Sequence, residues 1–126
     1  MHLTIIILLV LALYVVQIFL QETSLYRFNL FQIVGNRDTR PDESVIAARL
    51  ERAKNNMLEA LPLFLGLALL ALVKNAGNGR IADAATVFLV ARILYVPIYA
   101  AGIPLLRSIV WLAGMAALFF MALALI

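Results

Sequence analysis

One helical face in this mostly apolar sequence carries side chains that could bind a charged ligand. Within residues 49–64, RLERAKNNMLEALPLF, the side chains of Arg52, Asn56 and Glu59 are spaced i, i+4 and i+7. A helix turns by about 100° per residue, so these three side chains form one stripe, with Arg49 one turn earlier near the same side. This face therefore presents a guanidinium group, an amide and a carboxylate in a row.

A second face of the same kind occurs later in the chain. Arg92, Tyr95 and Tyr99 are spaced i, i+3 and i+7, and they again share one side of a helix. Arg92 lies in the middle of an apolar segment, where a charge is costly. Pro97 stands between the two tyrosines and is expected to kink the helix or to free a carbonyl group.

A third set of polar residues opens the last apolar segment. Arg107 and Ser108 begin this segment, and Trp111 lies one turn on from Arg107. A guanidinium group binds a carboxylate through two parallel hydrogen bonds, which suggests an anionic ligand. Glu59 could then hold an amine of the ligand, and Asn56 an amide. A peptide-like zwitterion such as glutathione, with two carboxylates, one amine and two amides, fits this set.

Each face also has a simpler explanation when it is considered alone. Arg49, Arg52 and Lys54 could anchor a helix at the membrane interface, and Glu59 could pair with Arg52 or Arg92. The aromatic side chains of the other two faces could form an aromatic belt. Three helices that turn such faces toward one leaflet are harder to explain by anchoring, and this favours a shared ligand site.

The composition determines the class of protein that carries these faces. Of the 126 residues, 65% are hydrophobic and 13% are charged, whereas a soluble domain is about half apolar and about a quarter charged. The chain is therefore predicted to be an integral membrane protein. Its net charge of +3 does not indicate nucleic-acid binding, because the basic residues flank apolar segments. Without cysteine, and with His2 as the only histidine, the sequence predicts no metal site.

The pattern predicts one all-α domain, residues 1–126, with four transmembrane helices. We expect them at about 3–26, 45–73, 81–99 and 104–126. Because the last two connections are short, neighbouring helices should be antiparallel and form an up-down four-helix bundle. The apolar part of the second helix, residues 60–73, measures about 21 Å. A bilayer core is about 30 Å thick, so the polar turn with Asn56 and Glu59 should enter the membrane.

The distribution of basic residues predicts the orientation of the helices. The first loop and its shoulders, together with the start of the fourth helix, hold most of the Lys and Arg residues, whereas the opposite side has only Lys74 and Arg80. The first loop should therefore be cytoplasmic, with both termini on the other side. The basic residues on the cytoplasmic side are Arg27, Arg37, Arg40, Arg49, Arg52, Lys54 and Arg107.

The segment 49–64 resembles the signature of the MAPEG family, the membrane-associated proteins in eicosanoid and glutathione metabolism. That signature is approximately R-x-x-R-A-x-x-N-x-x-E-x-x-P-x-F. Residues 91–111, ARILYVPIYAAGIPLLRSIVW, resemble the third-to-fourth helix region of the family, and the resemblance covers most of the chain from about Tyr26. The signature positions are matched by Arg49, Arg52, Ala53, Asn56, Glu59, Pro62 and Phe64.

The resemblance implies a homotrimer of four-helix subunits that binds glutathione in the clefts between neighbouring subunits. It implies Arg107 as the catalytic arginine, followed by Ser108, and leaves the alignment across residues 100–106 open. An arginine near the end of the first helix corresponds to either Arg27 or Arg37. The glutathione-binding residues carried over by the resemblance are Arg52, Asn56, Glu59, Arg92, Tyr95 and Tyr99, and Arg49 and Trp111 complete the predicted set.

The function implied by this resemblance is that of a membrane glutathione transferase acting on a lipophilic electrophile. With no cysteine in the chain, the thiol of glutathione would be the nucleophile, activated by Arg107 or by Ser108 as an alternative donor. A non-catalytic binding or scaffold protein of the same fold is the alternative. A small four-helix exporter is disfavoured, because residues 3–20 lack the carboxylate that proton coupling needs. The resemblance to small members of bacterial type implies the bacterial inner membrane.

Overall fold

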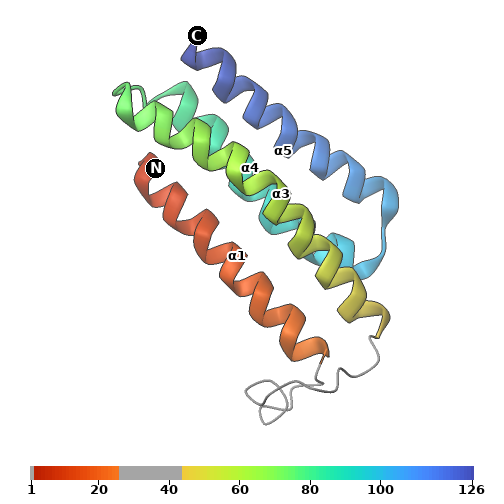
Figure 1. Ribbon diagram of the computed structural model, residues 1–126. Coiled ribbons are helices and arrows are strands. Elements are labelled where there is room, and N and C mark those ends of the chain that lie inside the picture. Colours follow the sequence, from red (N-terminus) through yellow and green to blue (C-terminus); the bar gives the residue numbers. More distant parts are fainter. Residues whose placement is uncertain (1, 26–43) are drawn as a thin grey trace.

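The computed structural model describes residues 2–25 and 44–126, and these residues form four helices. They are α1 (Leu3–Leu25), α3 (Val45–Val73), α4 (Arg80–Ala101) and α5 (Pro104–Leu125), shown in Figure 1. Each helix is long and apolar enough to cross a membrane, and no strand occurs in the described ranges. The chain is therefore an all-α, multi-pass integral membrane protein.

The helix boundaries can be compared with those expected from the sequence. The predicted second helix, 45–73, coincides with α3, whereas α4 extends beyond the predicted 81–99 at both ends. The last helix ends at Leu125 rather than at residue 126. Tyr26, together with the two alternative site arginines, Arg27 and Arg37, lies outside the described residues.

Local sequence explains where the helices start and stop. The Ser44 side chain caps α3 by accepting a hydrogen bond from the backbone N–H of Ala47 at 3.1 Å. At the end of α4, Gly102 adopts the left-handed conformation with φ 74°, and its N–H donates to the carbonyl of Tyr99 at 3.0 Å. Pro104 then begins α5, where a missing N–H has no cost. This tight turn sets where α5, and therefore its polar first turn, begins.

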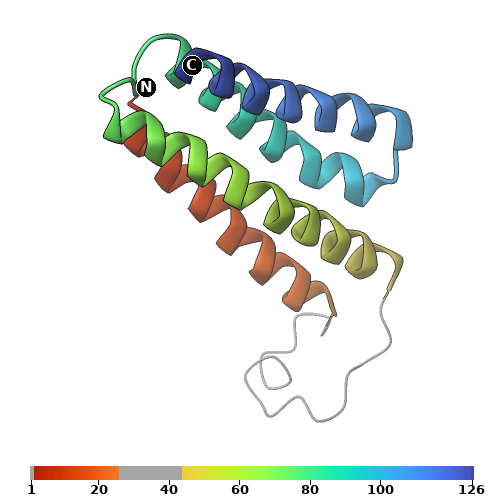
Figure 2. The ribbon, with the colours of Figure 1, turned by 45° about the horizontal axis from the view of Figure 1, so that its top comes forward.

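Contacts between helix ends show which ends lie together. The Lys74 ammonium, just after α3, donates to the carbonyl of Leu125 at 2.7 Å, so the end of α5 lies beside the α3–α4 turn. The start of α1 lies at the same end of the molecule, as Figures 1 and 2 show. At the opposite end, the Arg49 guanidinium donates to the carbonyl of Ala100 at 3.2 Å, which joins the start of α3 to the end of α4.

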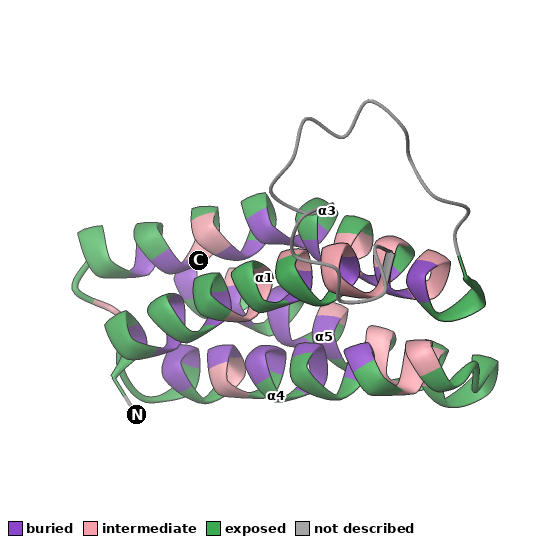
Figure 3. Cartoon of the chain, turned by 90° about the horizontal axis from the view of Figure 1, so that it is seen from below, coloured by how far each residue is buried: buried purple, intermediate pink, exposed green. Residues whose placement is uncertain are grey.

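The apolar core runs along the inner faces of the helices. The rings of Phe64 and Phe88 stack at its centre with centroids 4.8 Å apart, and Met57 and Met121 are completely buried. Figure 3 shows that buried residues line the facing sides of the helices, while the outer sides are exposed. These outer sides are rich in Leu, Val, Ile and Phe, as expected for helices that face lipid.

Candidate functional site

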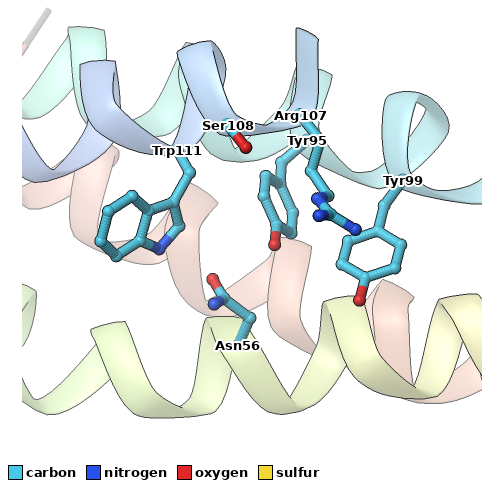
Figure 4. Close-up of a pocket in the computed structure, with 6 residues that line it drawn as sticks. All are labelled: Asn56, Tyr95, Tyr99, Arg107, Ser108 and Trp111. Atoms are coloured by element: carbon cyan, nitrogen blue, oxygen red, sulfur yellow. The ribbon is translucent and has the colours of Figure 1, made fainter. Parts of the chain in front are cut away.

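A polar cavity of about 280 Å³ opens between α3, α4 and α5, near the α4–α5 turn. Side chains from α4 and α5 reach across it toward Asn56 on α3 (Figure 4). Tyrosines of α4 and the first turn of α5 lie near one another in the sequence, whereas Asn56 of α3 comes from a distant part of the chain. The lining residues are Asn56, Tyr95, Tyr99, Arg107, Ser108 and Trp111.

A buried arginine holds the α3 side of this cavity in place. One terminal nitrogen of Arg92 donates to Oδ1 of Asn56 at 2.8 Å, and its guanidinium carbon lies 4.4 Å from the ring centroid of Tyr95. Only 2% of Arg92 is exposed, yet its Nε and Nη2 atoms have no hydrogen-bond partner among the described residues. A guanidinium group in a membrane interior normally faces a partner or a wet cavity, so these two donors indicate unused binding capacity.

Two further arginines lie around the ring of Tyr99. The Arg107 guanidinium carbon is 4.8 Å from the ring centroid, and that of Arg52 is 5.8 Å away. Arg52 also donates from Nε to the Tyr99 hydroxyl at 3.1 Å. The Tyr95 ring meets Tyr99 edge-on at 5.5 Å, which fixes both rings. Tyr99 therefore positions two cations, one from α3 and one from α5.

The two remaining α5 residues of the cavity differ in what they can offer. The Ser108 hydroxyl donates to the carbonyl of Pro104 at 3.1 Å, a bond to its own helix. Its hydrogen is therefore in use, and its oxygen is free to accept. Trp111 is half-buried and lines the cavity with an indole ring, which can pack against the apolar part of a ligand.

Four predicted site residues lie outside the cavity lining, and two of them, Arg49 and Glu59, contact none of the lining side chains through a hydrogen bond. Arg49 points to the α4–α5 turn, where it bonds Ala100, and a Cβ atom on Gly102 would come within 2.7 Å of its guanidinium carbon. Glu59 is exposed, although it is close enough to interact electrostatically with Tyr95. Of the predicted residues, six line the cavity, Arg52 and Arg92 hold cavity residues, and Arg49 and Glu59 lie at its margin.

The sequence analysis missed polar residues that the fold brings close to α3. Gln21 of α1 is 1% exposed and accepts a hydrogen bond from Lys54 at 3.4 Å. Gln17 is also buried, and neither of its amide atoms has a hydrogen-bond partner among the described residues. The i, i+4 spacing of two glutamines in a mostly apolar helix was the available signal. Gly102 was missed as well, because its role depends on Arg49.

The electrostatic character of the site follows from these contacts. No ion pair with another described residue neutralises Arg52, Arg92 or Arg107. Their partners are neutral: an amide and two tyrosine rings. Three such cations around one cavity form a site for an anion, most favourably a carboxylate or a thiolate.

Comparison with known protein families identifies the chain. The model of the MAPEG family matches residues 1–126, the whole length of the sequence. The chain belongs to the MAPEG family. No curated protein and no solved structure matched it. In this MAPEG protein, the signature-like segment 49–64 lies within α3 and supplies Asn56 to the cavity.

Proposed function

We propose that this MAPEG protein is a glutathione-binding membrane enzyme of the glutathione transferase type, acting on lipophilic electrophiles. The observation that carries the proposal is the convergence of Arg107 with Asn56, Tyr95 and Tyr99 on one cavity in a chain of this family. Cationic, amide and phenolic groups in one cavity match the carboxylates, amides and thiol of glutathione.

The residues present fit glutathione in charge and in hydrogen bonding. Within the described ranges, two buried donors of Arg92 have no partner and the guanidinium group of Arg52 forms no ion pair, so both can hold carboxylates. The Asn56 oxygen is already bonded to Arg92, which leaves its amide N–H groups for a ligand carbonyl. The exposed carboxylate of Glu59 at the cavity margin can hold the ligand's amine.

The chemistry proposed for the site requires a cation next to the reacting thiol. When bound, glutathione supplies a sulfur that bonds to an electrophilic carbon, while a leaving group departs from that carbon and the thiol proton passes to water. A thiol has a pKa of about 8.5, which a neighbouring cation lowers. Arg107 lines the cavity and forms no ion pair with a carboxylate in the described part of the chain, so it stabilises negative charge on the sulfur. Ser108 acts as an acceptor, since its hydrogen is bonded to Pro104.

We further propose the assembly and orientation that this function requires. The four helices form an antiparallel up-down bundle, and three subunits form a homotrimer in which a neighbouring subunit covers the open side of the cavity. The first loop faces the cytoplasm of a bacterial inner membrane, and both termini face the other side. The excess of Lys and Arg around the first loop supports this orientation.

Calorimetric titration of the detergent-purified protein with glutathione tests the binding half of the proposal. Trp111 is the only tryptophan and lines the cavity, so its fluorescence provides a second, local signal of binding. We expect saturable binding with a matching change in fluorescence. The absence of any binding at millimolar glutathione would refute the proposal.

Turnover of a chlorodinitrobenzene-type electrophile tests the catalytic half. Arg107→Ala should lower kcat/KM by roughly 10²–10³, the range found when one group that stabilises developing charge is removed. Arg107→Lys should retain part of the rate, and Lys54→Met, which removes a cation bonded to Gln21 outside the cavity, should retain all of it. Glutathione binding without turnover in the unmodified protein, across a panel of electrophiles, would instead identify a non-catalytic binding protein.

A further inference from the structure

A second hollow lies on the side of α4 and α5 that faces away from the polar cavity. It consists of one space of about 700 Å³ and a second of about 320 Å³, which share Val87 of α4 and Ala113 of α5. We call these two adjoining spaces the outer groove. Its α5 wall combines alanines, including Ala116 and Ala124, with larger apolar side chains such as Phe120, and the short alanine side chains leave space open.

The outer groove is apolar along its length but charged at one end. Arg80 and Asp83, in the first turn of α4, line the larger space. Both residues are exposed, and neither side chain forms a hydrogen bond or an ion pair with another described residue. They are spaced i, i+3 and therefore lie on one face of the helix. The end of the groove thus presents one positive and one negative group that are both free to bind a ligand.

The length of the groove suits a lipid chain. From Arg80 to Leu94, which lines the smaller space, α4 rises by about 21 Å. One leaflet of a bilayer core is about 15 Å thick, half of the full core. An acyl chain that starts at Arg80 can therefore remain in the groove across its whole leaflet. The charged end lies beside the α3–α4 turn, at the end of the helix where headgroups are found.

We propose that the outer groove binds one phospholipid with a phosphate and a primary ammonium group, of the phosphatidylethanolamine type. Arg80 binds the phosphate, Asp83 accepts hydrogen bonds from the ammonium group, and an acyl chain fills the space beside Ala113 and Ala116. This occupant matches both charges at the mouth of the groove as well as its apolar interior. An anionic lipid without an amine would leave Asp83 facing a like charge. The site is separate from the polar cavity and does not depend on glutathione binding.

Native mass spectrometry of the delipidated full chain, titrated with defined phospholipids, tests the proposal. We expect one phosphatidylethanolamine per chain, bound about tenfold more tightly than phosphatidylglycerol or phosphatidylcholine, since one charge-assisted contact distinguishes them. Asp83→Asn should remove this preference, because it weakens phosphatidylethanolamine binding and relieves the like-charge repulsion that opposes phosphatidylglycerol. Arg80→Gln should weaken all three lipids, because they share the phosphate.

A steric variant tests the groove itself. Ala116→Leu fills the hollow from an exposed position on α5, and Ala12→Leu makes the same change on the exposed side of α1 as a matched control. Circular dichroism of both variants checks that the helices are retained. Only Ala116→Leu should lower phosphatidylethanolamine binding. Equal binding of the three lipids, or equal effects of the two leucine variants, would overturn the proposal. A change in oligomer mass in Ala116→Leu that added lipid does not alter would also overturn it, because it would show that a second copy of the chain occupies the groove.

Discussion

Replacing Gly102 by alanine should destabilise the α4–α5 turn through two separate effects. The residue has φ 74°, a conformation that costs an L-residue with a side chain about 1–2 kcal/mol. The new Cβ would also lie 2.7 Å from the guanidinium carbon of Arg49, so that side chain must move. Moving it breaks the 3.2 Å bond to Ala100, which contributes about 1 kcal/mol at a partly exposed position. We expect a total loss of about 2–3 kcal/mol.

A double-mutant cycle separates these two effects. In an Arg49→Ala background the steric conflict is absent, so Gly102→Ala should cost only the conformational term of about 1–2 kcal/mol. Gly66→Ala is the matched control, because a Cβ at Gly66 has no neighbour within 4 Å. Gly66 lies within α3, and this variant should stabilise the protein by up to about 1 kcal/mol.

Equilibrium unfolding in mixed micelles, followed by the fluorescence of Trp111, measures these differences. Glutathione titration of the same variants reports on the cavity, because Arg107 follows the turn closely. Gly102→Ala should weaken any binding that depends on Arg107 more than Gly66→Ala does. The reasoning is refuted if Gly102→Ala costs the same with and without Arg49, or if it costs no more than the control.

Two further predictions concern the interior of the bundle. Arg92→Met removes a buried charge whose Nε and Nη2 atoms have no partner among the described residues, so the ligand-free protein should be at least as stable as the unmodified one in the same unfolding assay. Calorimetry should show loss of glutathione binding, and a clear loss of stability would contradict this account. Gly114→Ala should raise the free energy of unfolding by up to about 1 kcal/mol, because alanine favours a helix more than glycine does. The atoms nearest to the new Cβ lie at ordinary contact distances of 3.8–3.9 Å, on Ala91, Arg92 and Phe88. A lower unfolding midpoint would show that α4 and α5 pack too closely for this Cβ.

Much of this protein can be predicted from its sequence because the membrane leaves few alternatives. Backbone groups in lipid must bond within their own segment, so four long apolar stretches become four helices. Helical periodicity then fixes which side chains share a face, and it placed Tyr95 and Tyr99 together correctly. The signature in segment 49–64 indicated the family, which the match over residues 1–126 confirmed.

Helical periodicity does not determine which partner each helix face contacts, and only the tertiary structure decided these contacts. Arg49 and Arg52 lie on nearly the same side of α3, yet Arg49 bonds the end of α4 while Arg52 bonds Tyr99. Arg92 is held by Asn56, a residue 36 positions away in the sequence. These contacts depend on how far one helix is shifted along its neighbour, and that shift is set by core contacts such as the stacked rings of Phe64 and Phe88. The sequence therefore determined the helices and their polar faces, and the interhelical contacts selected which of those side chains line the cavity.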